Sequence, residues 1–430
     1  MIFSLDVRRA RKGDCLLLHV GSAAQPGLIL IDGGPDAVYG PHLRPRLIEI
    51  RDRRGLDDQQ PLPIDLLMIS HVDDDHLQGI LEFTSELKEA VGFPFAEIRR
   101  LWHNSFDAII GKNPAELTAG VAAQFGAAAL EGELPDDATI EGTVDEDEEV
   151  AQSTLKVLAS IPQGFKLRLD AEKLNIPLNP QTNEQLMMAS TKEITLGKGV
   201  TFTVVGPMQP ELLALQKKHD EWLKKLKKEG KKPEDVLAAF VDSSVPNLSS
   251  IVVLAKAGGK TMLLTGDARG DKILEGLEQI GLIDQGGSLH VDVLKVPHHG
   301  SANNVAPTFF RRITADHYVF SGDGEHGNPE REALEMLLRA RGSDAYEIHV
   351  TYPLAEIDVE REKDWKKEQK KEIARKQSGK STKKPREDWS AAKHGLVALF
   401  KKQPLTGGQK LHIVQEDSPH VIDLLDPLGF

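Results

Sequence analysis

The chain has 430 residues, 40% of them hydrophobic and 28% charged, a composition typical of a soluble globular protein. Its formal net charge of −13 argues against a protein that coats nucleic acid along its whole surface. The single cysteine, Cys15, excludes intrachain disulfides and thiolate-rich metal sites and fits a reducing cytosol. We find no signal-peptide pattern and no run of about 20 apolar residues, so we expect a cytoplasmic protein without a membrane partner.

The N-terminal part of the chain is predicted to begin with short strands. Two glycine turns interrupt them, Gly13-Asp14 and Asp32-Gly33-Gly34. Because turn chemistry alone explains both turns, we expect Asp14 and Asp32 to be structural or to support other site residues from behind. Apolar alternation and apolar runs predict three strands and then a helix, at residues 2–9, 15–20, 28–31 and 41–55.

A dense group of metal-ligand residues follows the apolar run 64–69, which has the length of a strand. The group consists of His71, Asp73, Asp75 and His76, and a helix is predicted after it at 80–91. His71 and Asp73 alternate and can point together, while Asp75 and His76 lie around the bend. One short loop could therefore supply two ligands to each of two metal ions.

The next predicted strand, 97–102, ends directly before His103. His103 could complete the site that His71 and Asp73 begin, or it could be a hydrogen-bonded loop histidine. From about 106 to 190 the chain is alanine-rich and helix-forming, and we expect a helical insertion that could act as a lid.

Strands return at 194–206, and a lysine-rich helix is predicted at about 210–233. Two further strands, 247–254 and 260–267, are joined by a glycine turn, and the second ends at Asp267. After a helix at 271–280, the run Val291-Asp-Val-Leu-Lys-Val-Pro-His298-His299-Gly-Ser301 follows.

The C-terminal part alternates again between strands and helices. A strand at 316–321 leads to His326, which lies in a turn before a helix at 329–341 and a strand at 347–352. Residues 356–390 form a lysine-rich charged insertion, and 391–430 are expected to return to the main fold. The basic tract beside Trp365 and Trp389 could follow a nucleic-acid backbone, or it could be a solvated insertion.

Two of these motifs resemble a known family. His71-x-Asp73-x-Asp75-His76 resembles the H-x-[HD]-x-D-H signature of metallo-β-lactamase-fold hydrolases. The run that contains His298 and His299 resembles the Leu-Lys-Val-x-His-His-Gly-Ser motif of the ComEC-like branch, named for a DNA-uptake competence protein. The resemblance implies an α/β fold, an αβ/βα four-layer sandwich over residues 1–355 with helical insertions.

The resemblance also implies roles for individual residues. His71, Asp73 and, as the open case, His103 would hold one ion. Asp75, His76 and His299 (or His298) would hold the other, and Asp267 would bridge both. The residues expected to act in catalysis are Asp75, His298 on the substrate side, and His326 as a phosphate contact or proton donor.

These residues predict a metal-dependent hydrolase with two divalent ions, zinc first and manganese as the alternative, and a metal-bridging hydroxide as nucleophile. The ComEC-like markers favour a phosphodiesterase or nuclease, which could be an effector in a bacterial defence or DNA-processing system. One alternative is a hydrolase of a small ester, lactone or phosphocholine-like substrate. Another is a metal-stabilised, non-catalytic binding or assembly subunit that docks a protein partner through its lysine-rich helices.

Overall fold

The computed structural model describes residues 1–71, 73–105, 108–109, 163–183, 185–210, 212–213, 250–379, 382–416 and 418–430. Most of the predicted helical insertion, including all of 110–162, lies outside these residues, as does nearly all of the predicted lysine-rich helix at 210–233. No helix within the described ranges combines the length and apolar character needed to cross a bilayer.

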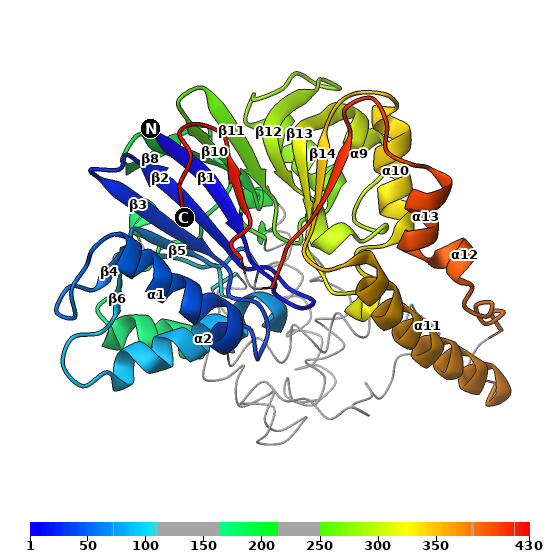
Figure 1. Ribbon diagram of the computed structural model, residues 1–430, viewed down its shortest axis with the longest axis horizontal. Coiled ribbons are helices and arrows are strands. Elements are labelled where there is room, and N and C mark those ends of the chain that lie inside the picture. Colours follow the sequence, from blue (N-terminus) through cyan, green and yellow to red (C-terminus); the bar gives the residue numbers. More distant parts are fainter. Residues whose placement is uncertain are drawn as a thin grey trace, which may run out of the picture.

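Two large sheets form the centre of this α/β protein (Figure 1). In the first sheet, the strands β1, β2, β3 and the C-terminal β16 pair antiparallel, whereas β3, β5 and β7 run parallel. The chain's last strand therefore lies beside its first. In spatial order the sheet consists of β16 (Val421–Asp423), β1 (Ile2–Val7), β2 (Leu16–Gly21), β3 (Pro26–Ile31), β5 (Leu66–Met68) and β7 (Leu101–Trp102).

The second sheet is antiparallel in one half and parallel in the other. Its first four strands along the chain pair antiparallel, and β11 to β15 are parallel, so their carboxyl ends meet at one edge. In spatial order it consists of β15 (Lys410–Ile413), β14 (Glu347–Val350), β13 (Ile313–Phe320), β12 (Leu289–Lys295), β11 (Lys260–Leu264), β10 (Val252–Ala257), β9 (Val200–Gly206) and β8 (Glu193–Gly197).

The buried hydrophobic residues form three cores, one between the two sheets and two between a sheet and its helices. One core joins the sheets directly, with Phe3 and Leu18 from the first against Phe202 and Val293 from the second. Another packs α1 (Arg44–Arg53) and α2 (Asp74–Glu89) on the first sheet and includes the buried Cys15. The third packs helices on the second sheet: α8 (Gly270–Gln279), α9 (Pro307–Arg312), α10 (Arg331–Arg341) and α13 (Leu396–Lys402).

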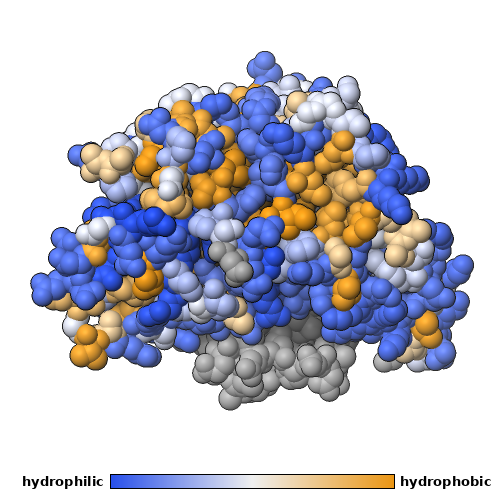
Figure 2. All heavy atoms as spheres, viewed as in Figure 1, coloured by the Kyte–Doolittle hydropathy of each residue, from blue (hydrophilic) through white to orange (hydrophobic). Residues whose placement is uncertain are grey.

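The long helix α11 (Leu354–Gln377) occupies the region predicted as a lysine-rich insertion and extends away from the sheets, covered mostly by hydrophilic residues (Figures 1 and 2). Three of its lysines pair within the helix: Lys363 with Glu360, Lys366 with Glu362 and Lys371 with Glu368. After it come α12 (Ala391–His394), α13, β15 and β16, so residues 391–430 place strands in both sheets.

Three predicted elements have other bounds in the structure. The predicted strand 64–69 and its neighbour 97–102 each break in two, into β4 (Leu62–Ile64) and β5, and into β6 (Ala96–Ile98) and β7. β4 and β6 form a separate small sheet, because the chain leaves the first sheet between the halves. The helix predicted at 80–91 begins earlier, at Asp74, where two acidic residues in the first turn favour a helix N-terminus.

Candidate metal centre

The candidate site lies where strand ends of both sheets meet. Asp267 follows β11 and His299 follows β12, at the shared carboxyl edge of the second sheet. His71 follows β5 of the first sheet, and His76 lies in the first turn of α2. Residues as far apart in the chain as His71 and His299 are thus brought into one centre.

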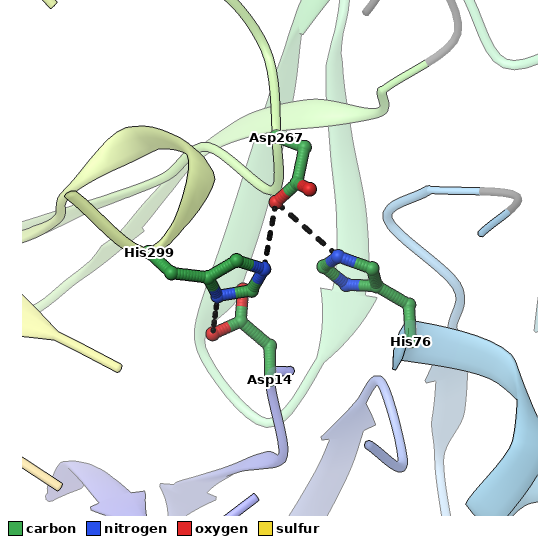
Figure 3. Close-up of side chains that lie close together, drawn as sticks. All are labelled: Asp14, His76, Asp267 and His299. Carbon is green, nitrogen blue, oxygen red and sulfur yellow. Dashed lines mark ion pairs between the residues drawn. The ribbon is translucent and has the colours of Figure 1, made fainter. Parts of the chain in front are cut away.

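Three side chains form the middle of the centre. Nε2 of His76 lies 3.2 Å from Oδ1 of Asp267, and Nε2 of His299 lies 3.4 Å from the same oxygen (Figure 3). All three residues are buried, with at most 2% of their surface exposed. Together with Asp14 they offer ligand atoms that lie within 4.8 Å of one another.

The atoms that face one another in this centre fit a metal. Within the described part of the chain, Nε2 of His76, Nε2 of His299 and Oδ1 of Asp267 are buried without a hydrogen-bond partner. Such atoms are costly to bury unless something binds them. Two imidazole nitrogens and a carboxylate oxygen are a donor set suited to zinc and similar divalent ions.

The other predicted ligands of the loop lie beside this middle. Oδ2 of Asp75 is 3.8 Å from His299, and its Oδ1 is 3.9 Å from His76. Nε2 of His71 lies 3.4 Å from Asp73, and the His71 ring meets the His76 ring edge-on with centroids 5.7 Å apart. The structure therefore places Asp75 near His299 and His76, and His71 near Asp73 and His76.

The neighbouring side chains of His298 and His299 have different surroundings. His299 is 1% exposed and faces Asp267 and Asp75. The His298 side chain is 27% exposed, lies 3.6 Å from Oδ2 of Asp267, and borders a cavity that His326 also lines. Both histidines have left-handed backbones, with φ of 47° and 55°, a strained conformation that often marks a functional turn.

His103 occupies a different environment from the other predicted ligands. It is buried, and its backbone is held by two hydrogen bonds of 2.9 Å to the Asn179 side chain. Among the described residues, no ion pair or ring contact joins its imidazole to the centre, and Gly164 lies against its Nε2. Burial and the nearby Arg168 lower the pKa of His103 to about 3. Its role as a ligand stays a prediction.

Each central histidine is held from behind by a carboxylate. Nδ1 of His76 lies 2.9 Å from Asp32, which also accepts hydrogen bonds from Ser70. Nδ1 of His299 lies 3.0 Å from Ser321 and 3.5 Å from Asp14, on the ring edge opposite Asp267. Such contacts select the tautomer whose Nε2 lone pair is available to a metal.

The support behind His299 includes residues to which sequence reasoning assigned no role. Lys295 is buried and lies 2.8 Å from Asp14, and Ser321 donates a hydrogen bond to the same carboxylate. Ser250 similarly lies 3.2 Å from Nδ1 of His71. Lys295 stands inside the Leu-Lys-Val motif, which is the one sequence signal that could have identified it.

Glycine permits the close approach of these turns. A Cβ on Gly13 would lie 1.8 Å from the backbone oxygen of Asp75, and one on Gly79 would lie 2.1 Å from that of Gly33. The Gly13-Asp14 turn and the Asp32-Gly33-Gly34 turn therefore pack directly against the start of α2, which places Asp14 and Asp32 behind the centre.

Charges in the centre shift the pKa values of its groups. Burial opposes the charged forms, but Asp267 and Asp32 hold the pKa of His76 well above its usual value. Against the same effect of burial, Asp267 and Asp14 raise the pKa of His299 to about 9. Conversely, and again against burial, His299, His76 and His298 hold the pKa of Asp267 well below its usual range.

The shift at His299 predicts opposite pH effects on the metal-free protein and on metal binding. The pKa of His299 is about 9 in the folded protein and about 6.5 in the unfolded chain. Protonated His299 therefore stabilises the metal-free fold fully below about pH 6.5, and this stabilisation is lost as the pH rises through about 9. A metal must displace that proton. We expect the melting temperature of metal-free protein to fall between about pH 7 and about pH 9.5, and zinc affinity to rise over the same range.

Thermal unfolding of chelator-treated protein and competition with a chromogenic chelator would measure the two effects. In His299→Gln both pH dependences should shrink. Equal zinc affinity at both pH values in the unaltered protein would contradict the assignment of His299 as a proton-competing ligand.

Comparison with known proteins finds only partial similarities. No family model matches the chain. Microtubule-associated protein 1A of Rattus norvegicus is 30% identical over 138 residues, which cover 31% of this chain and 5% of that protein. The Homo sapiens protein of the same name is 35% identical over 79 residues, or 18% of this chain and 3% of that protein. The chain thus spans only a small fraction of the curated relatives it matches.

Among solved structures, similarity extends over more of the chain but is distant. A metallo-β-lactamase from Cronobacter sakazakii shares 13% identity, covering 67% of this chain and 74% of that one, with a TM-score of 0.27. A candidate metal-dependent hydrolase from Parabacteroides distasonis shares 10% identity, covering 80% and 97%, with a TM-score of 0.30. These overlaps are too low to establish a common fold.

Proposed function

We propose that this protein is a metal-dependent hydrolase that cleaves phosphodiesters with two divalent ions. One observation carries the proposal: the buried, mutually facing and otherwise unbonded atoms of His76, His299 and Asp267. The motif resemblance supports it, and so do Asp75, His71 and Asp73 on either side. The three cores likewise support the proposed four-layer αβ/βα arrangement of residues 1–355, and two of them also include residues from 391–430.

When bound, such ions would lower the pKa of a water molecule and neutralise charge that develops on a phosphoryl group. The chain's own residues would do the positioning. Oδ1 of Asp267 faces both His76 and His299 and would help to hold the ion assigned to them. That Asp267 would also bridge to an ion at His71 and Asp73 rests on the motif resemblance. Asp32 and Asp14 fix the two imidazoles. His298 is partly exposed and borders the cavity, so it could contact the phosphoryl group or donate a proton to the leaving oxygen.

A cavity of about 410 Å³ extends from His298 and is the substrate site we propose. One wall comes from the turn that carries His326, and the opposite wall from α11 and the segment that follows it. Trp365 and Trp389 lie in this wall and pack edge-on, with centroids 5.8 Å apart. Arg386 and Arg361 cover their faces. His326 would contact the part of the substrate that lies in the cavity.

Nucleic acid is the first substrate class, on the motif resemblance. The Trp365 ring does not offer a stacking surface for bases, because Arg386 covers it and His394 stacks on it. The charges favour a second class. Acidic side chains line the same cavity, and α11 carries almost as many acidic as basic residues. Carboxylates beside aromatic rings suit a small phosphodiester with a cationic group, such as phosphocholine, better than a polyanion. The acidic lining residues are Glu330, Glu332, Asp364, Glu368 and Glu372.

A substrate panel tests the proposal. Metal-stripped protein, re-supplied with zinc, manganese or magnesium, is offered linear DNA, circular DNA, p-nitrophenyl phosphorylcholine and p-nitrophenyl acetate. His76→Ala and the exposed control His290→Ala run beside it. We expect metal-dependent cleavage of a phosphodiester, which His76→Ala loses and His290→Ala keeps. Comparing cleavage of DNA with cleavage of p-nitrophenyl phosphorylcholine decides between the two substrate classes.

Cleavage of the acetate alone would overturn the phosphodiesterase proposal in favour of an esterase. Absence of all hydrolysis with metals bound, together with binding of a protein partner that Asp75→Ala leaves unchanged, would indicate the non-catalytic assembly subunit. Nearly all of the lysine-rich segment 210–233 that could dock such a partner lies outside the described residues. A cytoplasmic location and a place in a bacterial defence or DNA-processing system are proposals that rest on composition and the resemblance.

A further inference from the structure

A second group of metal-ligand side chains lies on the second sheet, apart from the hydrolytic centre. We call it the histidine cluster. It gathers residues from three neighbouring parallel strands and from the segment that leads into β16. Among the described residues, no ion pair or ring contact joins it to the hydrolytic centre. The cluster consists of His317 on β13, Glu347 and His349 on β14, His412 on β15, and His420.

Strand register places the cluster on one face of the sheet. His317 pairs with Glu347, and His349 pairs with His412. Paired residues point to the same side, and so do residues two apart in a strand. The neighbour Val319 belongs to the core between the two sheets. The cluster therefore lies at the margin of the inter-sheet space, where the chain crosses from β15 in one sheet to β16 in the other.

The distances in the cluster are those of a metal site. Nδ1 of His317 lies 3.1 Å from Nε2 of His349 and 3.5 Å from Oε2 of Glu347. The ligand atoms of these three residues lie within 4.8 Å of one another. Ligands about 2.0–2.1 Å from a tetrahedral zinc ion lie about 3.3 Å from each other. Two of the separations are already close to that value.

A fourth side chain and two supporting groups surround the three ligands. Nε2 of His412 lies 2.9 Å from Oε2 of Glu347, and its ring stacks on His349 with centroids 4.7 Å apart. His420 lies 2.8 Å from Nδ1 of His349 and holds the ring from behind. Lys410 binds the other oxygen of Glu347 at 2.6 Å, which leaves Oε2 toward the histidines.

We propose that His317, Glu347 and His349 bind one divalent transition-metal ion of the zinc class, in a site separate from the hydrolytic centre. His412 or a water molecule takes the fourth position. The ion links β13 and β14 and, through His420, the segment that enters the first sheet. Its main effect is to stabilise the contact between the sheets.

The test compares metal content with and without the cluster. Asp267→Asn serves as the background, because it weakens the hydrolytic centre, and His317→Gln/Glu347→Gln is added to it. His290→Gln on β12, whose side chain is 55% exposed, is the matched control. Metal-stripped proteins are loaded with cobalt or zinc, dialysed and analysed. We expect the cluster variant to hold one ion fewer than the background, to lose a cobalt absorption band and to lose the zinc-induced rise in melting temperature.

Equal metal content in background and cluster variant would overturn the proposal and leave a hydrogen-bonded histidine array. Should the cluster variant fail to fold, anomalous diffraction at the zinc edge from crystals of the Asp267→Asn protein decides instead. A peak between His317, Glu347 and His349 supports the site, and its absence overturns it. Neither outcome depends on whether the hydrolytic centre cleaves any substrate.

Discussion

Asp267→Asn should reduce phosphodiester hydrolysis by about a thousandfold or more while the protein stays folded. The substitution keeps the size of the side chain and removes the charge that His76 and His299 share, at 3.2 and 3.4 Å. An amide binds a divalent cation far more weakly than a carboxylate does, so the ions would be lost or misplaced. Initial rates with bis(p-nitrophenyl) phosphate at saturating metal measure the loss.

Asp271→Asn is the matched control for this change. Asp271 lies four residues further on, at the start of α8, and forms an exposed ion pair with Arg269. Its rate should stay within about twofold of the unaltered protein, because exposed pairs contribute little. An Asp267→Asn protein that keeps a comparable rate would show that Asp267 is structural.

Lys295→Met should have the largest effect on stability, lowering the free energy of unfolding by about 3–5 kcal/mol. Lys295 and Asp14 are both about 1% exposed and lie 2.8 Å apart. Burial opposes the charged carboxylate, but Lys295 and His299 hold the pKa of Asp14 below its usual range. Without the ammonium group, the buried charge of Asp14 would be balanced only by protonated His299, 3.5 Å away. Urea unfolding of the metal-free protein measures the change.

Two variants separate lost charge pairing from lost packing. Lys260→Met removes a lysine whose side chain is 40% exposed from its ion pair with Asp292 and should cost at most about 1 kcal/mol. Asp14→Asn/Lys295→Met removes both charges and should recover part of the lost stability. A double variant no more stable than Lys295→Met alone would contradict the charge explanation. The double variant should also weaken metal binding, since Asp14 holds His299.

Local spacing was sufficient to predict that the four candidate ligands of the loop lie close together. His71, Asp73, Asp75 and His76 are close in sequence, and the structure keeps them close in space. Asp267 and His299 could be joined to them only through strand ends and the motif resemblance. The start of α2 was misplaced because the ligand motif was assigned wholly to a turn, although Asp74 and Asp75 also favour a helix N-terminus.

The supporting contacts could not be predicted, because they join residues far apart in the chain. The Ser321 hydroxyl and Asp14 are separated by 307 positions, and Ser250 and His71 by 179. Neither serine has a local signature. The histidine cluster was not predicted for the same reason. Its members His317, His349 and His412 each lie in a different strand, and only the strand register brings them together.

The central claim is that hydrolysis depends on two divalent ions held around Asp267. Metal content and bis(p-nitrophenyl) phosphate hydrolysis, measured on the same samples of unaltered protein and Asp267→Asn, test it most directly. The unaltered protein should hold up to two ions more than the variant and should be the only one that hydrolyses the substrate. Equal metal content in the two proteins, or a fully loaded unaltered protein that cleaves no phosphodiester, would contradict the claim.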